Sequence, residues 1–392
     1  MNDFTFQNQT KVYFGKKQLH HLHEEVLKYG NKVLVATGGK FILELPAYKN
    51  TMEELKNNGI EVYELQDVEP NPRHTTVNKG VAICKKENIA VVIAIGGGST
   101  IDCCKAISAT ALSETDNVWD LISGEVKWNQ ALPIIAMPTI ASTGSEMDKS
   151  CVISNIELNV KKGLSSDLIR PTVSFLNPEN TFTVPAGQTA CGGFDIFVHL
   201  IDMNYFVDAP KNPLQYNVVE TLLKVVKEYT PKCIQEPTNY EARGTMLWAA
   251  SWALNSFCTS GFKTLPSNHA IEKFSAFNDL THGLGLSIVM PRWMTYLLDK
   301  DETVVDDFAR FAINVMGVTP TGNKKEEAKA GIVALETYLT EELHMPRTLT
   351  EVGIDDSQFE EMAFEATYKQ GVLKGYRHLT TEDIVNIYKM CL

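Results

Sequence analysis

The pattern of apolar and polar residues divides the chain into two parts of different character. In the first part, short apolar runs alternate with segments in which apolar residues recur every three or four positions. The runs predict buried strands at residues 11–15, 32–39, 60–65, 90–99 and 132–139. The intervening segments predict helices at residues 18–30, 47–59 and 75–89. Continuous apolar strands that alternate with helices are typical of a parallel sheet covered on both faces.

Beyond residue 185 the strand pattern gives way to helical periodicity. Residues 215–230, 241–257 and 303–317 each show apolar positions in steps of three and four. We therefore predict an α/β domain with a parallel sheet, residues 1–183, followed by an all-α domain, residues 184–392. The length of 392 residues agrees with two domains. A cleft between the two domains is the expected active site.

Charge and cysteine usage narrow the class of protein. The chain has 36 basic and 48 acidic residues and a formal net charge of −12, which argues against a nucleic-acid partner. The 8 cysteines include no C-x-x-C pair, so we expect reduced cysteines in a cytoplasmic protein. The N-terminus lacks the pattern of a signal peptide. Since no apolar run reaches the ~18 residues of a membrane helix, we expect no membrane partner.

A glycine-rich turn follows the apolar run at residues 90–95. It consists of Gly96, Gly97, Gly98 and Ser99, and a helix is predicted to begin there. Glycines allow close approach of a ligand to the backbone, and free amides at a helix start suit a pyrophosphate. The order is neither G-x-G-x-x-G nor a Walker motif, and a tight turn without a ligand is the alternative.

A second loop of small residues, at positions 138–150, follows the next buried strand. Its hydroxyl-bearing residues include Thr139, Ser142 and Thr143. Such hydroxyls bind phosphate or ribose, or only satisfy the loop backbone. Two such loops at the carboxyl ends of strands in one sheet favour a nucleotide site, because ligands collect there in open α/β folds.

Four residues of the helical part have the chemistry of a metal site. Asp195 and His199 are four apart in the apolar segment "GGFDIFVHL", so they share one helix face. His269 and His282 also lie in apolar helical context. Each histidine alone is either a hydrogen-bonded core residue or a ligand. One carboxylate with three imidazoles suits Fe(II), Zn(II) or a similar ion.

Together these segments resemble the iron-containing alcohol dehydrogenases, the family of the butanol dehydrogenases and broad aldehyde reductases. "GGGSTIDCCKA", "PTIASTGSE", "GGFDIFVHL" and "THGLGL" occur in the right order and at the right separations, over nearly the whole chain. The resemblance implies a nucleotide-binding α/β domain followed by a helical metal domain. It also implies hydride transfer between a nicotinamide and the metal-polarised carbonyl of a small aldehyde or alcohol. We expect a homodimer.

The resemblance implies site residues as well. The metal, Fe(II) or Zn(II), is expected on Asp195, His199, His269 and His282. The cofactor, NADP(H) or NAD(H), is expected on Gly38, Gly39, Lys40, Gly96, Gly97, Gly98, Ser99, Asp102, Thr139, Ser142, Thr143, Lys161 and Leu176. Asp102 and Lys273 are the expected catalytic residues.

The chain departs from the family at Lys273. Most members resembling it carry a further histidine one turn after the third ligand, where this chain has Lys273, and the segment from His269 to His282 is one residue shorter. On a helix that begins near His269, Lys273 either relays a proton or turns toward solvent. We expect the second, because lysine is long enough to reach water.

The sequence leaves two questions with more than one answer: which nicotinamide cofactor the protein uses, and which activity it has. The turn at Gly38 and Gly39 has no acidic residue, and Lys40 follows it. Since a lysine pairs with a phosphate, this favours NADPH, whereas a solvated Lys40 is compatible with NADH. The alternative activities are a glycerol dehydrogenase-like polyol oxidoreductase and a nucleotide-binding protein with an impaired metal site.

Overall fold

The chain folds into two compact units. We analysed a computed structural model, which describes residues 2–158, 160–208, 212–261 and 265–392. The α/β unit contains Gln7–Val184 and Thr238–Asn255. The helical unit contains Met1–Phe6, Pro185–Pro237 and Ser256–Leu392. The domain boundary between residues 183 and 184 stays a prediction.

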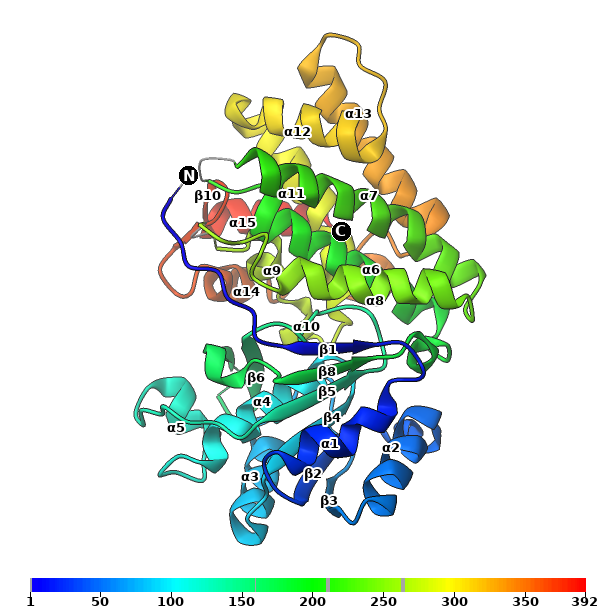
Figure 1. Cartoon of the computed structure of the whole chain (residues 1–392). Coiled ribbons are helices and arrows are strands. Elements are labelled where there is room, and N and C mark those ends of the chain that lie inside the picture. The colour runs from blue at the N-terminus through cyan, green and yellow to red at the C-terminus, as the bar shows by residue number, and fades with distance from the viewer. Residues whose placement is uncertain (1, 159, 209–211, 262–264) are drawn as a thin grey trace. The chain divides into compact units, whose positions relative to one another are not determined.

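The α/β unit is built on a six-stranded sheet in which all neighbouring strands are parallel (Figure 1). The strands, in spatial order, are β1 (Lys11–Phe14), β8 (Val173–Leu176), β5 (Ile134–Pro138), β4 (Val91–Gly96), β2 (Lys32–Thr37) and β3 (Glu61–Leu65). In the register of this sheet, Thr37 lies opposite Ile95 and Gly96 lies opposite Pro138. The carboxyl ends of β2, β4 and β5 therefore meet at one edge.

Helices cover both faces of the sheet, which explains why its central strands are apolar throughout. One face packs on η1 (Leu19–His21), α1 (Leu22–Leu27), η2 (Lys40–Glu44) and α2 (Pro46–Asn57). The other packs on α3 (His74–Glu87), α4 (Gly98–Ala111) and α5 (Val118–Ser123). Alternate residues of β2, such as Val33 and Leu34, enter opposite cores and are fully buried. The predicted parallel sheet is confirmed.

The rest of the α/β unit is irregular by comparison. An antiparallel hairpin joins β6 (Ser150–Asn155) to β7 (Val160–Ser165), and sequence analysis did not predict it. Short helical turns precede and follow β8, η3 (Asp167–Ile169) and η4 (Pro178–Thr181). The predicted helix at residues 241–257 is present as α8 (Tyr240–Leu254), and it belongs to this unit.

The helical unit consists of helices and one short hairpin. Its helical segments are α6 (Ala186–Leu200), η5 (Ile201–Tyr205), α7 (Pro213–Gln235), α9 (Ser267–Ile271), α10 (Phe274–Phe277), α11 (His282–Lys300), η6 (Glu302–Val304), α12 (Val305–Phe311), η7 (Ala312–Met316), α13 (Lys324–Thr337), η8 (Tyr338–Glu342), η9 (Thr350–Val352), α14 (Phe359–Ala366) and α15 (Thr381–Met390). The hairpin pairs β9 (Val372–Lys374) with β10 (His378–Thr380). Apart from this hairpin, the predicted helical second part is confirmed. No helix among the described residues has the length and apolar character needed to cross a bilayer.

Helix α6 lies in the core of the helical unit, in contact with α7 and α11. Its C-terminal half, from Phe194 to Leu200, is buried on every side of the helix. A helix that is apolar on all sides is one that the rest of the fold surrounds. This arrangement carries the polar residues Asp195 and His199 into the interior as well.

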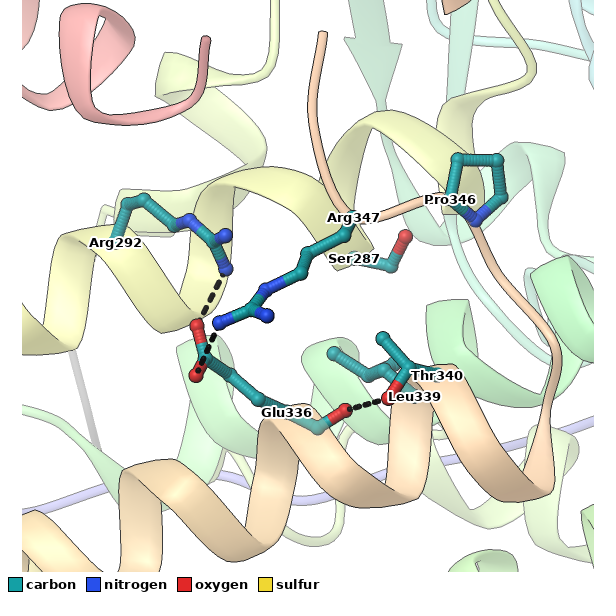
Figure 2. Close-up of a pocket in the computed structure, with 7 residues that line it drawn as sticks. All are labelled: Ser287, Arg292, Glu336, Leu339, Thr340, Pro346 and Arg347. Atoms are coloured by element: carbon teal, nitrogen blue, oxygen red, sulfur yellow. Dashed lines mark hydrogen bonds and ion pairs between the residues drawn. The ribbon is translucent and has the colours of Figure 1, made fainter. Parts of the chain in front are cut away.

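An ion pair with Glu336 of α13 holds helix α11, which begins at His282, against α13. Figure 2 shows Arg292 of α11 and Arg347 both reaching Glu336, with Nη1–Oε1 and Nη2–Oε2 distances of 2.7 and 3.5 Å. The cavity beside these side chains has a volume of about 10 Å³, enough for one water molecule. We therefore assign this cluster to helix packing rather than to substrate binding.

Candidate metal and cofactor sites

Three of the predicted metal ligands meet inside the helical unit. Asp195 comes from α6, His269 from α9, and His282 is the first residue of α11. One donor atom from each lies within 4.8 Å of the other two. The Oδ1 atom of Asp195 is 3.7 Å from Nε2 of His269 and 4.0 Å from Nε2 of His282.

The fourth predicted ligand, His199, lies beside this group. It follows Asp195 by one turn of α6, as the spacing predicts, and its Nδ1 atom is 3.7 Å from Oδ1 of Asp195. Its ring stacks on that of His269, with centroids 4.5 Å apart. The structure thus gathers all four side chains, with His199 flanking the three whose donors are mutually close.

The donors of this cluster fit a divalent ion. Within the part of the chain that the structure describes, Nδ1 of His199 and Nε2 of His269 are buried without a hydrogen-bond partner. Buried polar atoms without a partner are costly, and a cation between them removes that cost. A carboxylate with imidazoles is the donor set that Fe(II) and Zn(II) accept.

The protonation states of the metal-free cluster also favour a cation. Burial opposes the charge on Asp195, yet the imidazoles of His199, His269 and His282 hold the pKa of this carboxyl well below its usual range. Burial lowers the pKa of His199 to about 4, so this ring is neutral and its nitrogen is available to a metal. Burial lowers the pKa of His269 too, but the nearby carboxylates of Asp195 and Asp202 outweigh it and raise this pKa to about 9. A metal must therefore displace a proton from His269.

Asp202 orients the His269 ring through Nδ1, the nitrogen that does not face Asp195. Its Oδ2 atom accepts hydrogen bonds from Nδ1 and from the backbone N–H of His269, at 2.8 and 2.9 Å. Its Oδ1 atom accepts one from Asn268, at 2.8 Å. Asp202 lies in η5, where α6 widens into a π-helical turn, a feature that is frequent at functional sites. With Nδ1 held in this way, Nε2 of His269 is the atom left to face Asp195.

Glu272 does the same for His282. Its Oε2 atom contacts Nδ1 of His282 and accepts a hydrogen bond from the Ser275 hydroxyl at 2.8 Å. Its Oε1 atom accepts the backbone N–H of Ser275, also at 2.8 Å. The residue is only 3% exposed. Both histidines whose Nε2 atoms face Asp195 are thus backed by a buried carboxylate.

Sequence analysis missed both carboxylates. Asp202 follows His199 by three positions, and Glu272 follows His269 by three positions. Each carboxylate nevertheless contacts a different histidine: Asp202 binds His269, and Glu272 contacts His282. Local spacing therefore does not identify these pairs, and the one sequence signal is an acidic residue in an apolar segment, which requires a partner.

The chain around Lys273 differs from the predicted helix. Helix α9 ends at Ile271, Glu272 is extended, and the half-buried Lys273 is the N-cap residue of α10. The break follows from the role of Glu272, whose carboxylate caps Ser275 while it contacts His282. A continuous helix from His269 through Lys273 was the wrong prediction. A catalytic role of Lys273 stays a prediction.

The predicted cofactor residues gather at the carboxyl edge of the parallel sheet. Gly38 and Gly39 follow β2, and Lys40 is exposed at the start of η2. The turn of Gly96, Gly97, Gly98 and Ser99 follows β4. Thr139, Ser142 and Thr143 follow β5, and Leu176 ends β8. The Thr139 N–H donates to the Gly96 carbonyl at 3.0 Å, which joins the two main loops.

The turn at Gly98 is shaped by a close approach of these loops. A Cβ atom on Gly98 would lie 2.4 Å from Cγ2 and Oγ1 of Thr143, a distance that no real contact allows. Helix α4 begins at Gly98 without a side-chain cap, so its first amides are directed to the loop region. This is the arrangement that binds a pyrophosphate at a helix N-terminus.

Asp102 and Lys161 have structural partners in the α/β unit. The Oδ1 atom of Asp102 accepts from the Ser145 hydroxyl at 2.7 Å, and Oδ2 accepts from the Val152 N–H at 2.9 Å. Burial raises the pKa of this carboxyl. Lys161 donates to the side chain of Asn71 at 2.8 Å. These contacts fix α4, the second loop and the hairpin relative to one another, and the cofactor and catalytic roles of both residues stay predictions.

A parallel sheet with glycine-rich turns at its carboxyl edge, and a helical unit in which a buried carboxylate lies beside half-buried imidazoles, are typical of a metal-dependent nucleotide enzyme. Comparison with known proteins agrees. The family model of the iron-containing alcohol dehydrogenases matches residues 9–178, and the C-terminal model of the same family matches residues 189–392. The chain belongs to the iron-containing alcohol dehydrogenase family.

Individual relatives are similar over their whole length. NADH-dependent butanol dehydrogenase A of Clostridium acetobutylicum is 39% identical over 391 residues, which is 99% of each chain. NADPH-dependent aldehyde reductase YqhD of Escherichia coli is 29% identical over 91% of each chain. The solved structure of NADH-dependent butanol dehydrogenase A from Thermotoga maritima superposes with a TM-score of 0.91 at 32% identity, over 100% of this chain and 99% of the other.

These findings confirm the predicted family, fold class and enzyme class. The chain is an oxidoreductase, an NAD(P)H-linked alcohol dehydrogenase or aldehyde reductase with an iron site. The cluster of Asp195, His269 and His282 is the group of described residues with the donors for that metal.

Replacing the supporting carboxylates should weaken metal binding without unfolding the protein. We expect Asp202→Asn and Glu272→Gln each to lower Fe(II) or Zn(II) affinity about 10- to 100-fold, because each removes the acceptor that orients an imidazole. Chelator competition and metal analysis of the purified protein measure this. The matched control is Asp208→Asn, at an exposed acid of the same unit, which should bind metal like the wild type. Unchanged metal affinity in both carboxylate variants would contradict the prediction.

Proposed function

We propose that the chain reduces short to medium aliphatic aldehydes to the corresponding alcohols. The observation that carries the proposal is the cluster of the buried Asp195 with the half-buried His269 and His282, in a chain that matches butanol dehydrogenases from end to end. The names of the relatives supply the substrate class, since both butanol dehydrogenases and an aldehyde reductase are among them. No observed feature of the site favours the polyol alternative.

In this proposal, different residues hold the metal, orient its ligands and bind the cofactor. When bound, the metal supplies Lewis acidity at the substrate oxygen and the nicotinamide supplies the hydride. Asp195, His199, His269 and His282 would hold the metal. Asp202 and Glu272 keep the Nδ1 atoms of two imidazoles engaged, so that their Nε2 atoms stay aimed at Asp195. Gly96–Ser99 and the start of α4 would hold the pyrophosphate.

A homodimer is part of the proposal. Strand β1 is an edge of the sheet, and edge strands are available to pair with another chain. Phe14 at its end and the neighbouring Trp248 are each 40% exposed, with ring centroids 6.2 Å apart. We also propose a reducing compartment, the cytoplasm, because none of the eight cysteines forms a disulfide bond. Cell fractionation tests the compartment.

The iron-loaded full-length protein should oxidise NADH or NADPH in the presence of linear aldehydes. The loss of absorbance of the reduced nicotinamide, over a panel from acetaldehyde to octanal, measures the reaction. Asp195→Asn should lose at least about 100-fold in kcat/KM together with its metal, because the variant lacks the anionic ligand. Failure of the iron-loaded wild type to reduce any member of the panel would refute the proposed substrate class.

Lys273→Ala should change kcat by less than about threefold. The reason is that α9 ends at Ile271, so Lys273 does not lie one helical turn beyond His269 on the same face. Lys273→His should likewise leave metal affinity and turnover close to those of the wild type, because its imidazole would not lie on the His269 face either. Steady-state kinetics and metal analysis of each variant test both expectations. A large loss of kcat in Lys273→Ala with full metal content would make Lys273 a proton relay instead.

In solution the wild-type protein should have the mass of a dimer, and Phe14→Asp should shift it toward the monomer. A charge placed on an exposed apolar edge opposes its burial against a second copy. Size-exclusion chromatography with light scattering measures both. A wild-type protein with the mass of a monomer would contradict the proposed homodimer.

A further inference from the structure

A pocket of the α/β unit lies where β2 and β3 end, beside the glycine pair. Its volume is about 390 Å³, within the range of about 300–1,000 Å³ usual for small-molecule sites. Gly39 lines it from the β2 side, and Asp67 and Glu69 line it from the segment that follows β3. The backbone N–H of Val68 donates to the Thr37 carbonyl at 2.9 Å, which holds the two strand ends together.

The position of this pocket matches the ribose end of a dinucleotide. Strand β2 lies next to β4, whose glycine turn is the pyrophosphate site of the proposed function. In doubly wound sheets, a carboxylate near the end of the neighbouring strand binds the adenosine ribose of NAD, and a cation there accepts the phosphate of NADP. Here glycines follow β2, so the side chains that line the pocket come from the end of β3, from the segment that follows it, and from α3.

The charges that line the pocket are mainly negative. Asp67 is exposed, and Glu69 has one oxygen, Oε1, that accepts the Thr76 hydroxyl at 2.9 Å. Its other oxygen, Oε2, is buried without a hydrogen-bond partner among the described residues. Lys79 is the cation of the lining, and Lys40 is not among the described residues that form it. The two carboxylates outnumber the one ammonium group, so the lining repels the 2′-phosphate of NADPH more than it attracts it.

Asp67 is held in an unusual backbone conformation. Its φ angle is 64°, in the left-handed region that glycine and asparagine tolerate best and aspartate accepts. In this conformation Asp67 lines the pocket. Asparagine is therefore a substitution that keeps both the backbone and the shape of the side chain while it removes the charge.

We propose that Asp67 makes this enzyme select NADH over NADPH. Its carboxylate accepts a hydrogen bond from a ribose hydroxyl of NADH and repels the 2′-phosphate of NADPH. This inference rests on the proposed function, because it places the pyrophosphate at Gly96–Ser99. It replaces the expectation, drawn from Lys40 alone, that the turn after β2 favours NADPH.

The test is the binding of both cofactors to the iron-loaded full-length protein and its variants. Dissociation constants of NADH and NADPH are measured by nicotinamide fluorescence, and those of ADP-ribose and 2′-phospho-ADP-ribose by calorimetry. The wild type should bind NADH at least about tenfold more tightly than NADPH. Asp67→Asn should narrow that ratio at least about tenfold, mainly through tighter binding of the phosphorylated ligands. The matched control, Asp116→Asn, changes an exposed acid of the same unit and should leave the ratio unchanged.

The outcomes separate the inference from the function on which it rests. A wild type that prefers NADPH, or a ratio that Asp67→Asn does not change, would overturn the role of Asp67 and leave the proposed enzyme standing. If Lys40→Gln weakened NADPH selectively while Asp67→Asn had no effect, the expectation based on Lys40 would be restored. Failure of the wild type to bind any of the four ligands would overturn both the dinucleotide site and the inference.

Discussion

The burial of one carboxylate in an apolar helix is the constraint on which the helical unit depends. Asp195 is 3% exposed, with Phe194 and Ile196 beside it at 0%. An isolated charge in such surroundings costs far more than a small protein's net stability, so the fold must supply positive charge or a metal close by. The convergence of α9 and the start of α11 on α6 brings the imidazoles that meet this requirement.

The two supporting carboxylates make the cluster selective for a cation. Asp202 and Glu272 are both nearly fully buried, and each holds the Nδ1 atom of a histidine that faces Asp195. The interior therefore contains three carboxylates around three imidazoles, and neutral imidazoles do not balance them. Asp195 and Asp202 outweigh the effect of burial and raise the pKa of His269, so a proton on this ring offsets part of the negative charge. A divalent ion compensates more completely, which links metal affinity to the stability of this region.

Sequence patterns predicted those parts of the structure that depend on local periodicity. Apolar runs gave the positions of β2, β4 and β5, and the four-residue spacing of Asp195 and His199 placed both on one face of α6. The β6–β7 hairpin was missed because its strands are partly polar and partly exposed, without the long apolar runs of the central strands. The helix break after Ile271 was missed because it depends on a long-range contact, between Glu272 and His282.

Cofactor selectivity shows the same limit in the α/β unit. Read along the chain, the turn at Gly38 and Gly39 has Lys40 as its nearest charge, and the local sequence favours a phosphate there. In the sheet, the end of β3 lies beside the end of β2, so Asp67 reaches the same place from a distant part of the sequence. Gly38 and Gly39 have no side chains, so no side chain from this turn fills the pocket that Asp67 lines. In the proposal that Asp67 selects NADH, selectivity at this edge depends on the order of the strands as much as on any single motif, and the sequence of the β2 turn alone does not contain it.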